Sequence, residues 1–219
     1  MTVTAATDTR IVVFTKAPEP GAVKTRLIPL LGDVRAAALH QTLTDRAIAT
    51  ALAADIGPVT LCCAPTAQHP LLAHYCRRRD LTVSSQCDGD LGARMLHAAG
   101  NALTTLSRVI IIGSDSPAMT VADLQCAARA LDDYDVVLTP AEDGGYTLIG
   151  LTRCDATLFG HIAWGGNQVM ATTRERLAYL AWSWRELALS WDIDRPEDYR
   201  RLLASGIIPD LEPLQNSQG

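Results

Sequence analysis

Side chains that could hold a phosphate are concentrated in one loop near the start of the chain. The loop contains the cations Lys16, Lys24 and Arg26, together with Pro18 and Gly21. Glycine lets backbone N–H groups approach a phosphate, proline stiffens the loop, and lysine and arginine supply charge and a bidentate fork. We therefore expect all five residues to surround a nucleotide, with Lys24 and Arg26 also acting in catalysis. A basic surface turn is the alternative interpretation.

Three aspartates are suited to binding a divalent cation. Asp115 follows the apolar run 109–112, and Asp192 and Asp194 alternate in the last quarter of the chain. Mg²⁺ and Mn²⁺ take hard oxygen ligands, and phosphate and water can complete the coordination. We expect Asp115, with one or both of the other two, to hold Mg²⁺ or Mn²⁺. Asp115 is also expected to take part in catalysis. In the alternative interpretation, Asp115 and Asp194 cap helices that begin with proline.

A glycine-containing segment could recognise the base of the nucleotide. It includes Gly89, Leu91, Gly92 and Arg94, at the start of an expected helix. A planar base could lie on backbone that carries no side chain. Ordinary helix capping explains the same pattern, so both interpretations stay open.

An acidic turn could bind the acceptor or the sugar. The turn contains Asp143, Gly144, Gly145 and Tyr146, and we assign Trp164 to the same site. Carboxylates and an exposed aromatic ring suit a ligand that carries hydroxyl groups. A plain hairpin turn is equally compatible with these residues.

The strands and helices that must position these residues are predicted by apolar runs that alternate with helical patterns. Such an alternation is typical of an α/β protein with a mostly parallel sheet. Strands are expected at 11–14, 58–63, 81–84, 109–112, 136–138, 146–149 and 187–189, and helices at 33–54, 68–79, 91–106, 121–131, 167–180 and 196–204. The runs at 136–138 and 146–149 are expected to pair as a hairpin. Ligands of open α/β sheets bind beyond the carboxyl ends of the strands, and the basic loop directly follows the first run. We expect one domain over 11–208, with flexible segments at 1–10 and 209–219.

The composition excludes several classes of protein. A net charge of −5 over 219 residues argues against a nucleic-acid-binding surface and makes the basic loop stand out. The six cysteines contain no C-x-x-C pair, which favours reduced thiols. Residues 1–10 are polar and lack the apolar core of a signal peptide, and no apolar run approaches the length of about 20 residues that spans a membrane, so we expect a cytoplasmic location. The oligomeric state stays open.

Several blocks together resemble the glycosyltransferase-A-like proteins of the nucleotide-diphospho-sugar transferase superfamily, in the family that includes arsenosugar-biosynthesis glycosyltransferases. The matching blocks are 14–18 with Gly21, 24–27, 89–95, 113–117, 140–146 and 192–198. The blocks 24–27 and 192–198 also resemble phospholactate guanylyltransferases and, more distantly, molybdenum-cofactor guanylyltransferases. The resemblance implies a three-layer α/β/α fold with one mixed sheet, a nucleotide on the first loop and a divalent ion on Asp115. Where most glycosyltransferases of this fold carry Asp-x-Asp, this chain has Pro117 in place of the second aspartate.

The expected activity is metal-dependent transfer from a nucleotide donor to a small-molecule acceptor. Transfer of a glycosyl group from a nucleotide sugar is favoured by the family resemblance. Transfer of a nucleotidyl group from a nucleoside triphosphate to a phosphate-bearing acceptor is favoured by the 24–27 block and the single aspartate at 115. A nucleotide-binding protein without catalysis is a third possibility.

Overall fold

The computed structural model describes residues 8–209, which form a seven-stranded sheet in the order β3-β2-β1-β4-β6-β5-β7. The strands are β1 (Thr9–Lys16), β2 (Val59–Ala64), β3 (Thr82–Ser85), β4 (Arg108–Gly113), β5 (Val136–Pro140), β6 (Tyr146–Leu151) and β7 (Trp184–Glu186). Neighbouring strands are parallel except where β6 pairs with β4 and β5. This confirms the expected mostly parallel mixed sheet, and the pairing of β5 with β6 confirms the hairpin.

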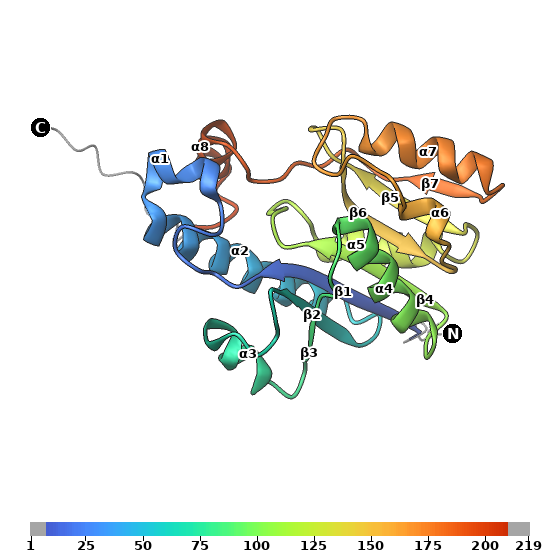
Figure 1. The fold of residues 1–219 in the computed structure, drawn as a ribbon, viewed down its shortest axis with the longest axis horizontal. Coiled ribbons are helices and arrows are strands. Elements are labelled where there is room, and N and C mark those ends of the chain that lie inside the picture. The colour runs from blue at the N-terminus through green and yellow to red at the C-terminus, as the bar shows by residue number, and fades with distance from the viewer. Residues whose placement is uncertain (1–7, 210–219) are drawn as a thin grey trace, which may run out of the picture.

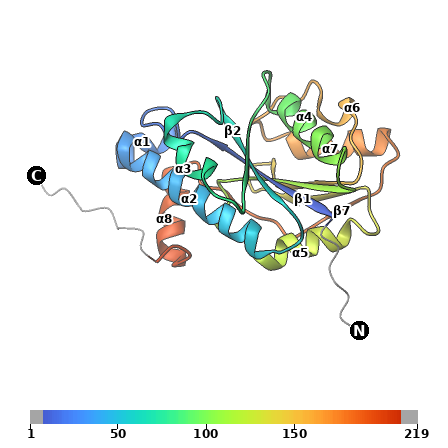
Figure 2. The same cartoon turned by 90° about the horizontal axis from the view of Figure 1, so that it is seen from below.

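Helices cover both faces of the sheet and confirm the three-layer α/β/α architecture (Figures 1 and 2). They are α1 (Ile28–Leu31), α2 (Asp33–Ala53), α3 (Ala73–Cys76), α4 (Leu91–Leu103), α5 (Val121–Ala130), α6 (Ala156–Phe159), α7 (Val169–Tyr179) and α8 (Pro196–Ser205), with 3₁₀ turns η1 (Thr25–Leu27) and η2 (Pro70–Leu72). α2 and α5 pack on one face, whereas α4, α6 and α7 pack on the other. No helix among residues 8–209 is long and apolar enough to cross a membrane.

The central strand β4 shows why the sheet is buried on both faces. Ile110 and Ile112 point into the core under α2 and α5, while Val109 and Ile111 point into the core under α4 and α7. Alternate side chains of a strand point to opposite faces, so a strand made only of branched apolar residues is buried on both faces of the sheet.

Two expected elements differ from the structure. The expected helix 68–79 is reduced to η2 and α3, which bury only Leu72 and Tyr75. So small an apolar face does not stabilise a longer helix. The last strand lies at Trp184–Glu186 rather than at 187–189. Residues 184–186 are the ones that pair with β5, and Leu189 is 64 % exposed.

The first strand begins at Thr9, so residues 9 and 10 belong to the sheet and not to a flexible N-terminal segment. The remaining parts of the two expected flexible ends, residues 1–7 and 210–219, lie outside the described residues.

Residues 187–195 form a connection from β7 to α8, here named the C-terminal strap (Figure 1). The Leu187 amide donates to the Leu138 carbonyl at 2.8 Å, and the Ile193 amide donates to the Asp115 carbonyl at 2.9 Å. The strap therefore contacts β5 itself and the loop beyond β4. It brings distant parts of the sequence to one edge of the sheet.

Candidate active site

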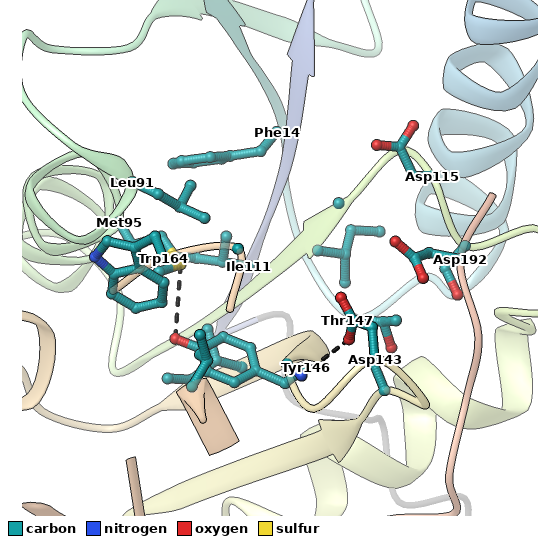
Figure 3. A pocket seen from close by; sticks show the side chains of 18 of the residues that line it. Phe14, Leu91, Met95, Ile111, Asp115, Asp143, Tyr146, Thr147, Trp164 and Asp192 are labelled. Atoms are coloured by element: carbon teal, nitrogen blue, oxygen red, sulfur yellow. Dashed lines mark hydrogen bonds between the residues drawn. The ribbon is translucent and has the colours of Figure 1, made fainter. Parts of the chain in front are cut away.

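A pocket of about 250 Å³ opens at the edge where the parallel strands end (Figure 3). Its wall includes the end of β4, the start of β6, the first residue of α4 and the strap. At one end stand Asp115, Asp143 and Asp192, and the remainder is mostly apolar. The carboxylates come from three separate segments, so the fold rather than local sequence assembles them.

Lys24 lies beside this cluster as a buried cation. Its side chain is 5 % exposed, and its Nζ lies 2.6 Å from Asp115 Oδ1. Nζ also donates to the carbonyl of Ile193 in the strap. The Lys24 backbone is left-handed, with φ of 49°, a conformation that is unfavourable for lysine. The two polar contacts hold the side chain at the site in spite of that backbone cost.

Asp115 has two different sides. Its Oδ1 is buried, with Lys24 as one neighbour and His40 Nδ1 at 3.6 Å as another. The side chain as a whole is 44 % exposed and lines the pocket. Burial acts to raise the pKa of Asp115, but Lys24 and His40 outweigh burial and hold that pKa below its usual value. Asp115 is therefore an anion at neutral pH, with an exposed part free to meet a ligand.

Asp192 is in the opposite electrostatic situation. Burial, followed by the nearby carboxylates of Asp143 and Asp115, raises the pKa of Asp192 to about 6, and Lys24 opposes the shift. The side chains of all three aspartates gather at one end of the pocket in Figure 3. Negative charge therefore accumulates there beyond what Lys24 neutralises.

Arg26 and Asp194 form a separate pair with each other outside the pocket lining. Both are substantially exposed, at 63 % and 43 %. Asp194 does not cap α8, because Asp198 Oδ2 accepts the amides of Asp194 and Arg195 instead. No helix begins at Asp115 either, since α5 starts at Val121. Of the two candidates in the strap, the structure brings Asp192 to Asp115 and leaves Asp194 with Arg26.

The residues expected to bind the nucleotide base lie in different parts of the structure. Leu91 lines the pocket, but Arg94 lines a second cavity on the other side of α4 and donates to the Gly89 carbonyl at 3.0 Å. Gly92 has a packing role: a methyl group there would lie 2.4 Å from the Phe159 carbonyl oxygen and 2.7 Å from Trp164 Nε1. None of the five loop residues expected to surround the nucleotide lines the pocket. Lys24 and Arg26 form ion pairs beside it, Lys16 and Gly21 are exposed, and Pro18 is buried.

The residues expected at the acceptor do come together. Asp143, Gly145, Tyr146 and Trp164 all line the pocket. Gly144 supports them from behind: its φ is +90°, and a side chain there would lie 2.3 Å from the Asn167 carbonyl oxygen. The turn is thus pressed against the segment that begins α7.

Sequence reasoning missed two groups of residues. His40 contacts Asp115, and its Nε2 lies 3.2 Å from Thr15 Oγ1, although no histidine spacing indicated a role. The apolar wall of the pocket was missed as well, namely Phe14, Met95, Ile111 and Val169. Their strand and helix periodicity is that of ordinary core residues, and only the three-dimensional arrangement shows that they face a pocket.

The carboxylates fit a divalent cation if the ligand completes the coordination. Among residues 8–209 no three His, Cys, Asp or Glu side chains form a ready metal cage. Mg²⁺ is commonly held by one or two carboxylates plus substrate phosphates and water. Asp115 and Asp192 match that donor set, and a bound cation would offset the negative charge that the carboxylates place at one end of the pocket.

A sequence model of the family described as "Uncharacterized protein conserved in bacteria (DUF2064)" matches residues 47–166. The chain belongs to the DUF2064 family. A solved structure of a putative nucleotide-diphospho-sugar transferase from Desulfovibrio desulfuricans G20 is 30 % identical to this DUF2064 protein, with a TM-score of 0.84 over 96 % of this chain and 89 % of the other. This confirms the resemblance to the nucleotide-diphospho-sugar transferases and their fold.

More distant structures share the fold with this DUF2064 protein. Rv0371C from Mycobacterium tuberculosis H37Rv, solved as a complex with manganese, is 19 % identical with a TM-score of 0.54, covering 90 % of this chain and 99 % of that one. CMP:2-keto-3-deoxy-manno-octonic acid synthetase complexed with CTP is 13 % identical with a TM-score of 0.56, covering 90 % and 99 %. None of the curated proteins matches the chain.

Proposed function

We propose that this protein transfers a glycosyl group from a nucleotide sugar to a small acceptor, with help from Mg²⁺ or Mn²⁺. The observation that carries the proposal is the meeting of Lys24, Asp115 and Asp192 at the carboxyl edge of the sheet, next to a pocket. Assignment to the transferases is supported by the 30 % identical structure, which is named as a nucleotide-diphospho-sugar transferase. The manganese in the Rv0371C structure supports the choice of metal.

Asp115 and Asp192 would hold the cation, which when bound supplies positive charge to the diphosphate of the donor. Lys24 neutralises Asp115 in the ligand-free protein, and its ammonium is placed to pair with phosphate oxygens once a donor enters. Arg26 is exposed and can turn from Asp194 to the phosphates, where its fork makes bidentate contacts. These positive charges would stabilise the nucleoside diphosphate as it leaves.

The acceptor would lie against Asp143, Tyr146 and Trp164. Asp143 is exposed at the mouth of the pocket, within reach of an acceptor hydroxyl. In glycosyl transfer that hydroxyl oxygen bonds to the anomeric carbon, the bond from this carbon to the diphosphate breaks, and the hydroxyl proton must leave. Asp143 lines the pocket and is not one of the proposed cation ligands, so it is the carboxylate available to accept that proton.

Nucleotidyl transfer is the second candidate. It is favoured by the positions of the two carboxylates. Pro117 stands where Asp-x-Asp would place the second aspartate, and the carboxylate that meets Asp115 is instead Asp192, from a distant segment. In that reaction an acceptor oxygen attacks the α-phosphorus of a nucleoside triphosphate and pyrophosphate leaves. Lys24 and Arg26 would serve the same purpose for this leaving group.

One assay separates the two reactions. The protein is incubated with Mn²⁺ and either nucleotide sugars or nucleoside triphosphates, and release of nucleoside diphosphate or of pyrophosphate is measured, with calorimetric titration of donor binding alongside. Asp115→Asn should remove the Mn²⁺-dependent part of donor binding, whereas Asp80→Asn, an exposed aspartate paired with Arg78, should leave it intact. Unchanged Mn²⁺-dependent affinity in Asp115→Asn would contradict the metal assignment. Donor binding with neither product formed would favour a binding protein without catalysis.

A further inference from the structure

The part of the pocket away from the carboxylates is an apolar chamber, lined by Phe14, Leu91, Met95, Ile111, Tyr146 and Trp164 (Figure 3). Two of its walls are aromatic rings set at right angles, since the Tyr146 and Trp164 ring centroids lie 6.3 Å apart with an interplanar angle of 90°. Met95 and Ile111 are 4 % exposed and form the inner end. We propose that this chamber receives an uncharged apolar group of about the size of a six-membered ring, carried by the acceptor.

The chamber has little to offer a polar ligand. The Tyr146 hydroxyl donates to the sulfur of Met95 at 3.9 Å, and burial raises the pKa of Tyr146 far above its usual value. The Trp164 Nε1 is buried and faces Gly92 on α4. A sugar ring placed here would lose the hydrogen bonds that its hydroxyls make with water, at a cost of about 1–3 kcal/mol for each unpaired group. An apolar ring has no such cost.

The carboxylate end of the pocket indicates how the ligand is attached. Asp143 lines that end, next to the apolar chamber. A ligand with an apolar body and a hydroxyl group next to it could fill the chamber and present the hydroxyl to Asp143. The hydroxyl would then lie where the proposed transfer takes place.

Charge and size agree with a neutral apolar group. Asp143 and Asp192 at the open end disfavour a ligand that carries a phosphate without a cation. A dry apolar cavity of about 150 Å³ accepts benzene in another protein, and the whole pocket, carboxylate end included, measures about 250 Å³, so one ring and its linking carbon fit within it. The inference depends on the proposed function only in naming the bound group as the acceptor.

Benzyl alcohol is a suitable probe, and glucose is its polar counterpart. Binding of each to the full chain is measured by saturation-transfer NMR titration, without nucleotide or metal. Benzyl alcohol should bind, and glucose should bind at least about tenfold more weakly. Leu91→Asn should weaken benzyl alcohol about fivefold, as expected for the loss of one apolar wall. Leu71→Asn is the matched control, because Leu71 and Leu91 are both 43 % exposed and Leu71 lies outside the pocket.

Two outcomes would overturn the proposal. Glucose binding as tightly as benzyl alcohol would show that the chamber is not selective for apolar groups. Displacement of benzyl alcohol by nucleosides would assign the chamber to the base of the nucleotide. Trp164→Phe should retain binding, because an aromatic wall remains. Asp115→Asn should also retain binding while losing Mn²⁺-dependent donor affinity, so failure of the proposed function and failure of this inference give different results.

Discussion

At the scale of single residues, one buried cation contacts two acceptors beside the pocket. The Lys24 ammonium contacts both Asp115 and the carbonyl of Ile193, and its side chain is almost completely buried. Removal of a buried partner leaves the other charge without compensation, which costs more than the net contribution of the pair. Arg26 and Asp194 form an exposed pair in the same region, so the two pairs allow a direct comparison.

Lys24→Met should lower the free energy of unfolding by about 1–3 kcal/mol, because Asp115 Oδ1 would stay buried without its cation. Arg26→Met should change it by less than about 1 kcal/mol, since exposed ion pairs contribute little. Urea unfolding of both variants checks this prediction. Equal losses in the two variants would contradict a special role for the buried pair.

Asp192→Asn should stabilise the ligand-free protein at neutral pH. The pKa of Asp192 in the folded protein is raised to about 6, above the ordinary carboxyl value, so the folded state binds more protons than the unfolded state between about pH 4 and pH 6. The wild type therefore loses stability as pH rises through this window, by about 3 kcal/mol at most. The variant has no carboxyl group at this position and lacks that loss.

The measurement is the difference in unfolding free energy between Asp192→Asn and wild type at pH 4 and at pH 7.5. The advantage of the variant should be clearly larger at pH 7.5. An advantage that does not depend on pH would mean that burial and the neighbouring carboxylates do not raise the pKa of Asp192 in the folded protein. Asp80→Asn again provides an exposed control.

At the scale of elements, close packing of α4 against the 159–164 segment forms one wall of the pocket. Gly92 and Gly100 lie in the same helix but in different surroundings. A methyl group at Gly92 would meet Trp164 and the Phe159 carbonyl below 3 Å, whereas nothing lies within 4 Å of one at Gly100. The two glycines therefore form a matched pair for testing this contact.

Gly92→Ala should destabilise the protein by about 1–3 kcal/mol and displace Trp164, because the close contact cannot be accommodated without movement. Gly100→Ala should stabilise it by about 0.5–1 kcal/mol, since alanine has the higher helix propensity. Thermal unfolding and tryptophan fluorescence of both variants are the measurements. A neutral Gly92→Ala would show that α4 and Trp164 are not tightly packed.

Sequence patterns predict elements well where burial decides them and poorly where it does not. The strand at 109–112 agrees with the structure because its continuous branched run is buried on both faces, and the helix at 121–131 agrees because it has a Thr120 cap and an apolar face. The last strand is misplaced by three residues because an edge strand is fixed by its partner, β5, and not by its own composition. The strap also decides between Asp192 and Asp194, which local sequence could not, because only the fold shows which one faces Asp115.

At the scale of the whole molecule, the strap connects the edge strand β7 to the core formed by α1, α2 and α8. Ile193 is fully buried in a third core with α1, α2 and α8, while its backbone contacts both Asp115 and Lys24. Trp191 lies in the same core, and its carbonyl accepts the Ser116 hydroxyl at 2.9 Å. The edge that carries the site and the core at one end of the molecule are thus mechanically linked.

Ile193→Ala should reduce the free energy of unfolding by about 2–4 kcal/mol through loss of a fully buried side chain. Unfolding should stay a single transition, with tryptophan fluorescence and far-UV circular dichroism coinciding, because the strap joins both parts of the structure. Two separate transitions in the wild type would contradict this link. Val34→Ala, at an exposed position, should have little effect.

The strap also has a consequence for the order in which the protein becomes competent during synthesis. Lys24, Asp115 and Asp143 leave the ribosome well before Asp192, and the core that buries Trp191 and Ile193 of the strap is completed when α8 packs beside α1 and α2. A nascent chain that has completed all seven strands would still lack one carboxylate of the site. Chains that stop short of α8 are therefore expected to be inactive as well as unstable, which couples activity to completion of the polypeptide.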